Sequence, residues 1–95
     1  MASSFTNLRG PFAYGTGANA GANPVRMVGQ ITADGGGSDL TYKFPMQVVD
    51  VVYAQQNDAL TFIKCEIDST TKNQVTFSGM VADKLYKVIV EGFGC

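Results

Sequence analysis

Short apolar segments separated by turn-forming residues constrain the fold of this chain more than any other feature. Within the segments, apolar and polar side chains alternate or β-branched residues dominate, and both patterns favour β-strands. The predicted strands cover residues 25–32, 40–44, 46–54, 60–67, 75–77 and 85–90. Turn signals spaced roughly 8–12 residues apart are typical of a sandwich or a small barrel.

The expected fold class is therefore all-β: a small β-sandwich or partly open barrel of about six short strands. A short helix across residues 59–64 is the alternative to the first part of the 60–67 strand. The 46–54 strand is apolar on both faces apart from Asp50, which predicts a central position in its sheet. In the 85–90 strand, Tyr86, Val88 and Val90 are expected to share one face.

Residues 1–23 differ in composition from the rest of the chain. They are rich in Gly, Ala, Asn and Ser and show neither helical nor strand periodicity. Because glycine makes a helix costly and the stretch cannot form a core, we expect it to be extended or disordered on its own. The predicted organisation is an N-terminal arm over residues 1–23 and a β-domain over residues 24–95.

Aromatic side chains in the arm point to a binding role. Such side chains are rare in purely disordered tails, so we expect them to pack against the chain's own sheet or into a groove on a neighbouring subunit. A mobile tail is the alternative. The predicted partner-binding residues are Phe5, Leu8, Arg9, Phe12 and Tyr14.

Charge argues against several classes of partner. Charged residues make up 16% of the chain and the formal net charge is −1. Since the seven Lys and Arg residues are scattered, no basic surface for nucleic acid is expected. The first residues lack the pattern of a signal peptide, and no apolar run approaches the ~20 residues that cross a bilayer. The expected location is the cytoplasm, unless the protein leaves as part of an assembly.

Side chains for catalysis are scarce. The chain has no histidine, which removes the commonest general base and metal ligand. Most of the eight acidic residues fall in predicted turns, where carboxylates accept hydrogen bonds from the backbone. Asp50 and Glu66 lie in predicted strands, where exposed positions are expected in preference to a glycosidase-like acid–base pair. We therefore predict a non-enzyme with no catalytic residue, cofactor or metal.

Three further features of the sequence share some residues with known ligand sites. Residues 34–39 could hold calcium through two carboxylates and backbone oxygens, but they lack the EF-hand spacing and are expected to form a flexible loop. The glycines at 15–17 and 35–37 lack the strand, helix and lysine of a phosphate loop. Cys65 and Cys95 share no zinc spacing. Cys65 is expected to be a small apolar side chain on a strand, and a disulfide between the two remains open.

Residues 74–81 (QVTFSGMV) and 85–92 (LYKVIVEG) form one pattern, and residues 44–52 (FPMQVVDVV) form another. The first is similar to the V-x-F-x-G-L…Y-x-V-x-V-x-G hairpin that ends many small tailed-phage virion proteins, and the second resembles their central strand. The resemblance covers roughly residues 44–92. It implies a capsid decoration (cement) protein on the virion surface, bound to the major capsid protein as a homo-oligomer, either dimer or trimer.

Two other functions stay open at this point. One is a different virion part, such as a tail, neck or fibre module. The other is a carbohydrate-binding sandwich in which Tyr14, Tyr42 or Tyr53 stacks on sugar rings. A decoration protein is the preferred interpretation, because a rigid β-body with an arm that spans subunits suits a protein that stabilises a shell by binding only its assembled form.

Overall fold

The computed structural model describes residues 2–13 and 24–94, and all of the regular secondary structure in these ranges is β-strand. The strands are β1 (Ser4–Ala13), β2 (Pro24–Thr32), β3 (Leu40–Lys43), β4 (Val48–Gln56), β5 (Lys64–Ile67), β6 (Gln74–Ser78) and β7 (Leu85–Phe93). The predicted all-β class is confirmed, and the described residues contain seven strands instead of about six.

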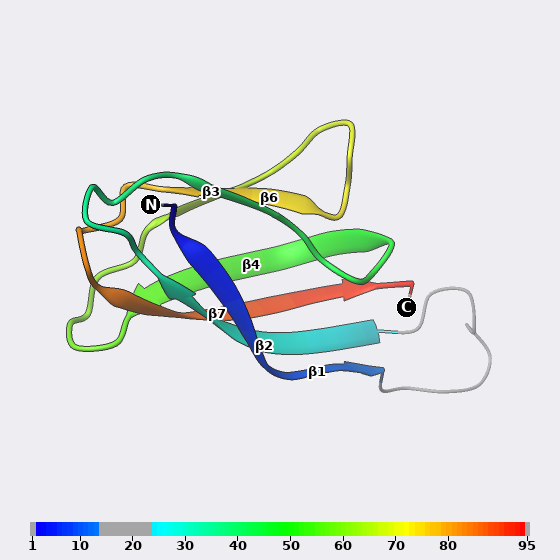
Figure 1. The fold of residues 1–95 in the computed structure, drawn as a ribbon. Helices are drawn as coiled ribbons and strands as arrows, with labels where there is room; N and C mark the ends of the chain where they lie inside the picture. The colour runs from blue at the N-terminus through cyan, green and yellow to red at the C-terminus, as the bar shows by residue number, and fades with distance from the viewer. Residues whose placement is uncertain (1, 14–23, 95) are drawn as a thin grey trace.

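The strands form two antiparallel sheets that pack face to face (Figure 1). The larger sheet has the order β1-β2-β7-β4 and the smaller has the order β3-β6-β5. The two sheets do not close into a barrel, so the sandwich is the alternative that the structure supports.

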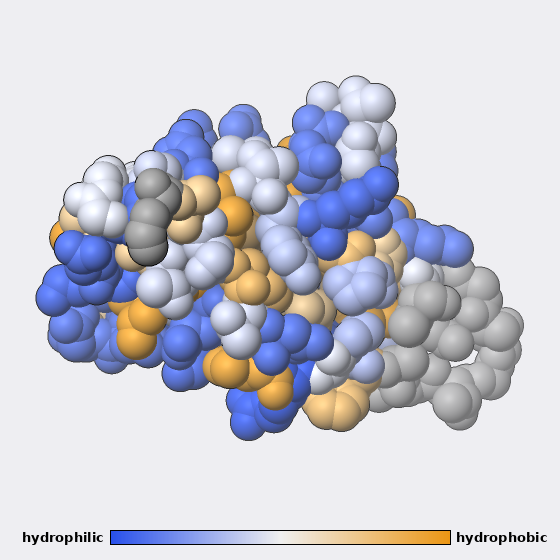
Figure 2. All heavy atoms as spheres, in the orientation of Figure 1, coloured by the Kyte–Doolittle hydropathy of each residue, from blue (hydrophilic) through white to orange (hydrophobic). Residues whose placement is uncertain are grey.

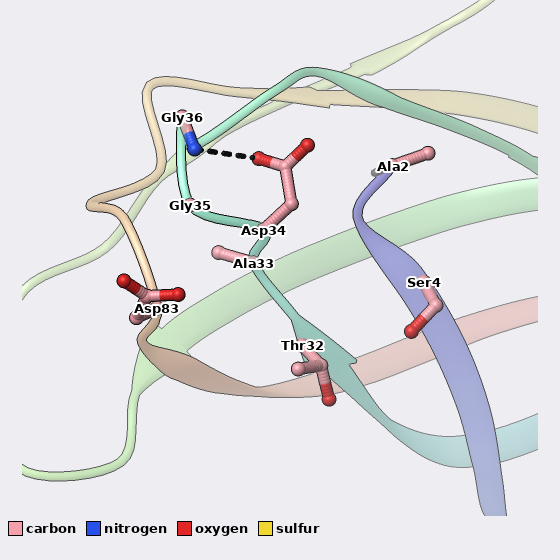
Figure 3. A pocket seen from close by; sticks show the side chains of 8 residues that line it. All are labelled: Ala2, Ser4, Thr32, Ala33, Asp34, Gly35, Gly36 and Asp83. Atoms are coloured by element: carbon pink, nitrogen blue, oxygen red, sulfur yellow. Dashed lines mark hydrogen bonds between the residues drawn. The ribbon is translucent and has the colours of Figure 1, made fainter.

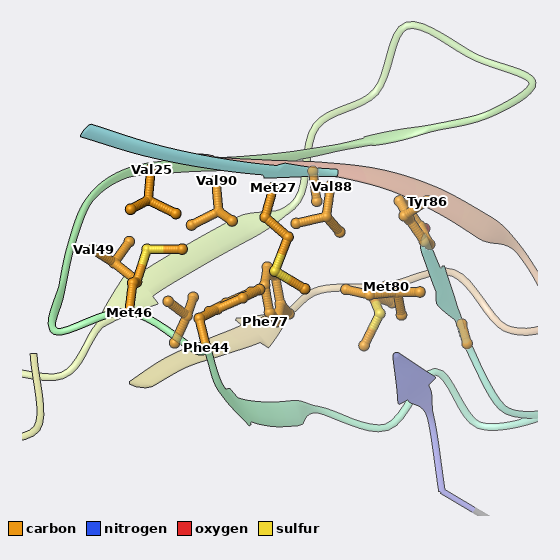
Figure 4. Close-up of a cluster of buried hydrophobic side chains, with 14 residues drawn as sticks. Val25, Met27, Phe44, Met46, Val49, Phe77, Met80, Tyr86, Val88 and Val90 are labelled. Carbon is orange, nitrogen blue, oxygen red and sulfur yellow. The ribbon is translucent and has the colours of Figure 1, made fainter. Parts of the chain in front are cut away.

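The inner strands of the larger sheet are β2 and β7, which pair without interruption from Pro24 opposite Phe93 to Thr32 opposite Leu85. Alternate side chains of both strands point into the sandwich, and Figure 4 shows them on one side of the ribbon, facing Phe44 and Phe77. The predicted common face of β7 is confirmed: the inward residues Tyr86, Val88 and Val90 are almost fully buried. Each such side chain contributes roughly 1.5–3 kcal/mol through its burial.

The prediction of a central strand at residues 46–54 is wrong. The corresponding strand, β4, is at the edge of the larger sheet. A register shift between Val49 and Val51 marks a β-bulge, and beyond it Val51 and Tyr53 are 54% and 42% exposed. Apolar residues on both faces of β4 therefore do not mean that both faces are buried. The outward face carries apolar side chains that the described residues leave uncovered.

The predicted 60–67 strand is shorter than expected, and the helical alternative at residues 59–64 is wrong. Only Lys64–Ile67 forms β5. The preceding residues bend along the edge of β4, where Phe62 makes an isolated bridge to Gln55 and the Ile63 amide donates to the Ala54 carbonyl at 3.1 Å. These bonds satisfy part of the β4 edge.

A strand that the sequence did not predict, β1, lies within residues 1–23. It pairs antiparallel with β2, and two register shifts interrupt the pairing, one between Asn7 and Arg9 and one between Arg9 and Phe12. Each shift disturbs the two-residue alternation, which explains why no strand periodicity is visible in the sequence. Residues 14–23 lie outside the described residues, so the division of the chain at residue 24 stays a prediction.

Candidate functional site

The first predicted anchor, Phe5, packs against its own chain. Its ring centroid lies 4.2 Å from that of Tyr42 and 5.4 Å from that of Phe44. The ring occupies the space beside Gly29, where any β-carbon would overlap it. Because Tyr42 belongs to β3, Phe5 joins the edge of the larger sheet to the smaller one.

Hydrogen bonds of Ser3 hold the start of β1 against the loop that follows β2. The Ser3 hydroxyl donates to the Ser38 carbonyl at 2.7 Å and accepts from the Asp34 amide at 3.2 Å. Ser3 is only 4% exposed. The first half of β1 is therefore held by the body of the protein.

The second half of β1 presents three of the predicted anchors to solvent. Leu8 and Phe12 are 43% and 57% exposed, and Arg9 is exposed between them. The Asn7 side-chain amide donates to the Gly10 carbonyl at 2.8 Å and closes the bulge that carries Leu8. The structure thus brings Leu8, Arg9 and Phe12 together on one sheet edge and separates Phe5 from them, and Tyr14 lies outside the described residues.

This edge is suited to side-chain contacts more than to strand addition. Its two register shifts and Pro11 interrupt the row of free backbone donors and acceptors that a further strand would need. Figure 2 shows that apolar side chains elsewhere on this view of the molecule gather in several small patches among polar ones. A partner at β1 would therefore bind mainly through Leu8 and Phe12.

The loop at residues 34–39, the calcium alternative of the sequence, borders an open hollow of about 580 Å³ next to the start of β1 (Figure 3). One oxygen of the Asp34 carboxylate accepts hydrogen bonds from the amides of Gly36 at 3.1 Å and Ser38 at 2.8 Å. These bonds stabilise the ionised form, so the pKa of Asp34 is lowered. Within the described residues, no three acidic or cysteine side chains gather where a metal ion could bind.

Replacement of Asp34 is expected to destabilise the fold in a pH-dependent way. Because its pKa in the folded state lies below the ordinary value of 3.8, the carboxylate stabilises the fold above that pH, and the contribution is lost as the pH falls through the lowered pKa. Asp34→Ala should therefore unfold at a lower temperature than the unsubstituted chain at about pH 7, and the difference should shrink below about pH 4. Thermal unfolding followed by circular dichroism at several pH values measures this.

Asp39→Ala, in the same loop, is the matched control for loss of a carboxylate that caps no amide in the described residues. A gap between Asp34→Ala and the unsubstituted chain that stays constant down to about pH 2 would contradict the role assigned to the ionised carboxylate.

Cys65 has the properties of a structural side chain. It is half-buried on β5, and its thiol donates to the Ile63 carbonyl at 3.6 Å. Burial raises the pKa of this thiol to about 11, so little reactive thiolate is present at neutral pH. Cys95, its partner in the possible disulfide, lies outside the described residues. The expected exposure of Asp50 and Glu66 is confirmed.

The tyrosines proposed for sugar stacking differ in accessibility. Tyr42 is half-buried among Phe5 and Phe44, whereas Tyr53 on β4 is 42% exposed. The Tyr53 ring lies 6.1 Å from that of Phe62, which is 60% exposed. The sequence did not predict this exposed pair, because the bridge that brings Phe62 to β4 has no local signal.

In the part of the chain that the structure describes, no helix has the length and apolar character needed to cross a membrane. Comparison of the chain with protein-family models gives no match, and comparisons with curated proteins and with solved structures give none either.

Proposed function

We propose that this chain is a structural protein of a phage particle, a capsid decoration protein that binds the major capsid protein and stabilises the head shell. The observation that carries the proposal is the exposed second half of β1, where Leu8 and Phe12 are 43% and 57% exposed beside Arg9. Large apolar side chains held at a sheet edge are typical of protein interfaces.

The body of the protein supports this role by holding the edge rigidly. Phe5 and Ser3 fix the strand at one end, and the pairing with β2 fixes it along its length. Little conformational entropy is then lost when Leu8 and Phe12 enter apolar pockets on a capsid protein. Arg9 can form a bidentate pair with a carboxylate beside those pockets.

Low charge supports a role in a crowded array. Charged residues make up 16% of the chain, and the net charge of −1 keeps repulsion between neighbouring copies small. A protein that binds the assembled shell more tightly than its separate subunits stabilises the shell by mass action. No catalytic chemistry is needed for this function.

The double substitution Leu8→Ser with Phe12→Ser tests the proposal. If each side chain acts as an anchor, binding to phage heads assembled without this protein should weaken about 30-fold or more. Cosedimentation of the purified protein with such heads measures the affinity. Thermal unfolding confirms that the variant is folded, which is expected because both side chains are exposed.

Leu60→Ser is the matched control, since Leu60 is 91% exposed and lies in the loop between β4 and β5. It should bind heads as the unsubstituted protein does. A double variant that binds with unchanged affinity would refute the role of β1. Absence of the protein from heads together with its presence on purified tails would refute the decoration function and favour a tail module.

A further inference from the structure

The outward face of the larger sheet is apolar at its centre. Val28 on β2 and Tyr53 on β4 lie on either side of Ile89 on β7, each directly opposite it in register. These residues alternate with the core residues of their strands and so point away from the smaller sheet. No other described strand covers them, because β3, β5 and β6 all lie on the opposite side.

The outward face of the smaller sheet differs from it. Its side chains are polar: Thr41, Lys43, Lys64, Glu66, Gln74 and Thr76. The Thr41 and Thr76 hydroxyls lie 3.1 Å apart across two strands. The sandwich therefore has one polar outer face and one outer face with an apolar centre, and covering that centre is favourable.

Two opposite charges lie at equal distances from Ile89 along the apolar face. Lys87 and Glu91 lie two residues before and two residues after Ile89, so both share its face of β7. Glu91 also pairs with Arg26 across the strands at 3.7 Å. Consider two copies whose larger sheets face each other, related by a two-fold axis midway between the sheets. If this axis passes over Ile89 at right angles to β7, Lys87 of each copy lies opposite Glu91 of the other.

The same axis places like on like along the apolar row, with Ile89, Tyr53 and Val28 each facing its own counterpart. The area is that of a weak association. Strands of nine residues on β2, β4 and β7 form a face of roughly 14 by 30 Å. Two such faces bury about 840 Å², below the roughly 1,000 Å² of a stable interface, so the contact is that of a weak dimer.

We propose that a second copy of this chain binds this face, and that the two larger sheets pack face to face about a two-fold axis through Ile89. The central contact is the apolar row, and two symmetric Lys87–Glu91 ion pairs flank it. This dimer does not depend on the decoration function, because β2, β7 and β4 make its contact. β1, where Arg9 lies opposite Val28 and Phe12 opposite Arg26, borders this face and stays outside the contact.

Ile89→Lys tests the apolar centre. Two lysines would meet at the axis without a counter-charge, so the variant should sediment as a monomer of 10.1 kDa, whereas the unsubstituted chain should sediment at twice that mass. Thr41→Lys, at an outward position of the smaller sheet, is the matched control and should remain dimeric. Circular dichroism and thermal unfolding confirm that each variant is folded.

The charge pairs allow a test that does not depend on the apolar centre. In a dimer of Lys87→Glu, each introduced glutamate lies opposite Glu91 of the other copy. In a dimer of Glu91→Lys, each introduced lysine lies opposite Lys87 of the other copy. Each variant alone should dimerise at least about tenfold more weakly than the unsubstituted chain. An equal mixture should form a mixed dimer, because the two introduced side chains then meet each other with opposite charges. The native Glu91 of the first variant likewise meets the native Lys87 of the second.

Failure of the two folded variants to associate when mixed would overturn the proposal. An unsubstituted chain that stays monomeric up to about 1 mM would overturn it as well. If that monomer loses binding to heads when Ile89 is replaced by lysine, the face belongs to the capsid contact and the dimer is refuted. Loss of head binding in the β1 variant alone leaves the dimer intact, so the two proposals fail separately.

Discussion

Phe44→Ala is expected to lower the free energy of unfolding by about 4 kcal/mol. Phe44 is 1% exposed, and its ring lies 5.4 Å from that of Phe5, 5.0 Å from that of Tyr42 and 6.3 Å from that of Phe77. It is therefore the point at which β1, β3 and β6 meet. Truncation removes these edge-on aromatic contacts and leaves a cavity between the sheets.

Urea unfolding at constant pH measures this loss. Since natural domains have a total stability of about 5–15 kcal/mol, the variant should lose a large part of its margin. Leu60→Ala is the control at an exposed position, where a change within about 0.5 kcal/mol is expected. A loss below about 1.5 kcal/mol for Phe44→Ala would show that Phe44 is not the centre of the core.

Gly92→Ala is expected to lower the free energy of unfolding by about 3 kcal/mol or more. Gly92 lies opposite Val49 on the paired strands β7 and β4, beside the bulge of β4. A β-carbon at this position would overlap the carbonyl oxygen of Val48 and lie 2.9 Å from the sulfur of Met46. The carbonyl belongs to the backbone, so the overlap cannot be relieved by a side-chain rotation, and β4 must move away.

Urea unfolding compares this variant with Gly35→Ala. Nothing lies within 4 Å of a β-carbon built on Gly35, and this second variant should be neutral or stabilised by up to about 1 kcal/mol. Equal stability of the two variants would refute the close packing of β7 against β4. Hydrogen exchange should also be faster in β4 of Gly92→Ala, because the strand at the sheet edge is the one that yields.

The strands that could be predicted from the sequence are those whose alternation is unbroken. In β7, the inward Tyr86, Val88 and Val90 are separated by single residues, and the pairing with β2 has no register shift. Local pattern is sufficient in such a strand, because each side chain is assigned to the core or to the surface by the two-residue repeat alone.

Features that depend on distant contacts could not be predicted. The apolar content of β4 indicates burial, but its place at the sheet edge depends on which strands pair with it, and pairing partners have no local signal. For β1, two bulges break the repeat that would have identified a strand.

The candidate site was predicted in part for the same reason. Leu8, Arg9 and Phe12 are exposed on one edge, as an interaction site requires. Phe5 belongs to the same stretch of sequence, yet it packs inward, because Gly29 on the neighbouring strand leaves room for its ring. Only the three-dimensional pairing of β1 with β2 separates a core residue from a candidate anchor here.

The position of β7 also determines when folding can take place. β7 lies between β2 and β4, which pair with it and not with each other. Until Leu85–Phe93 has left the ribosome, β2 and β4 lack the strand that pairs with both of them. Their apolar faces then stay accessible to chaperones. Joining β2 to β7 then closes a loop over residues 33–84, and such a long-range contact slows folding.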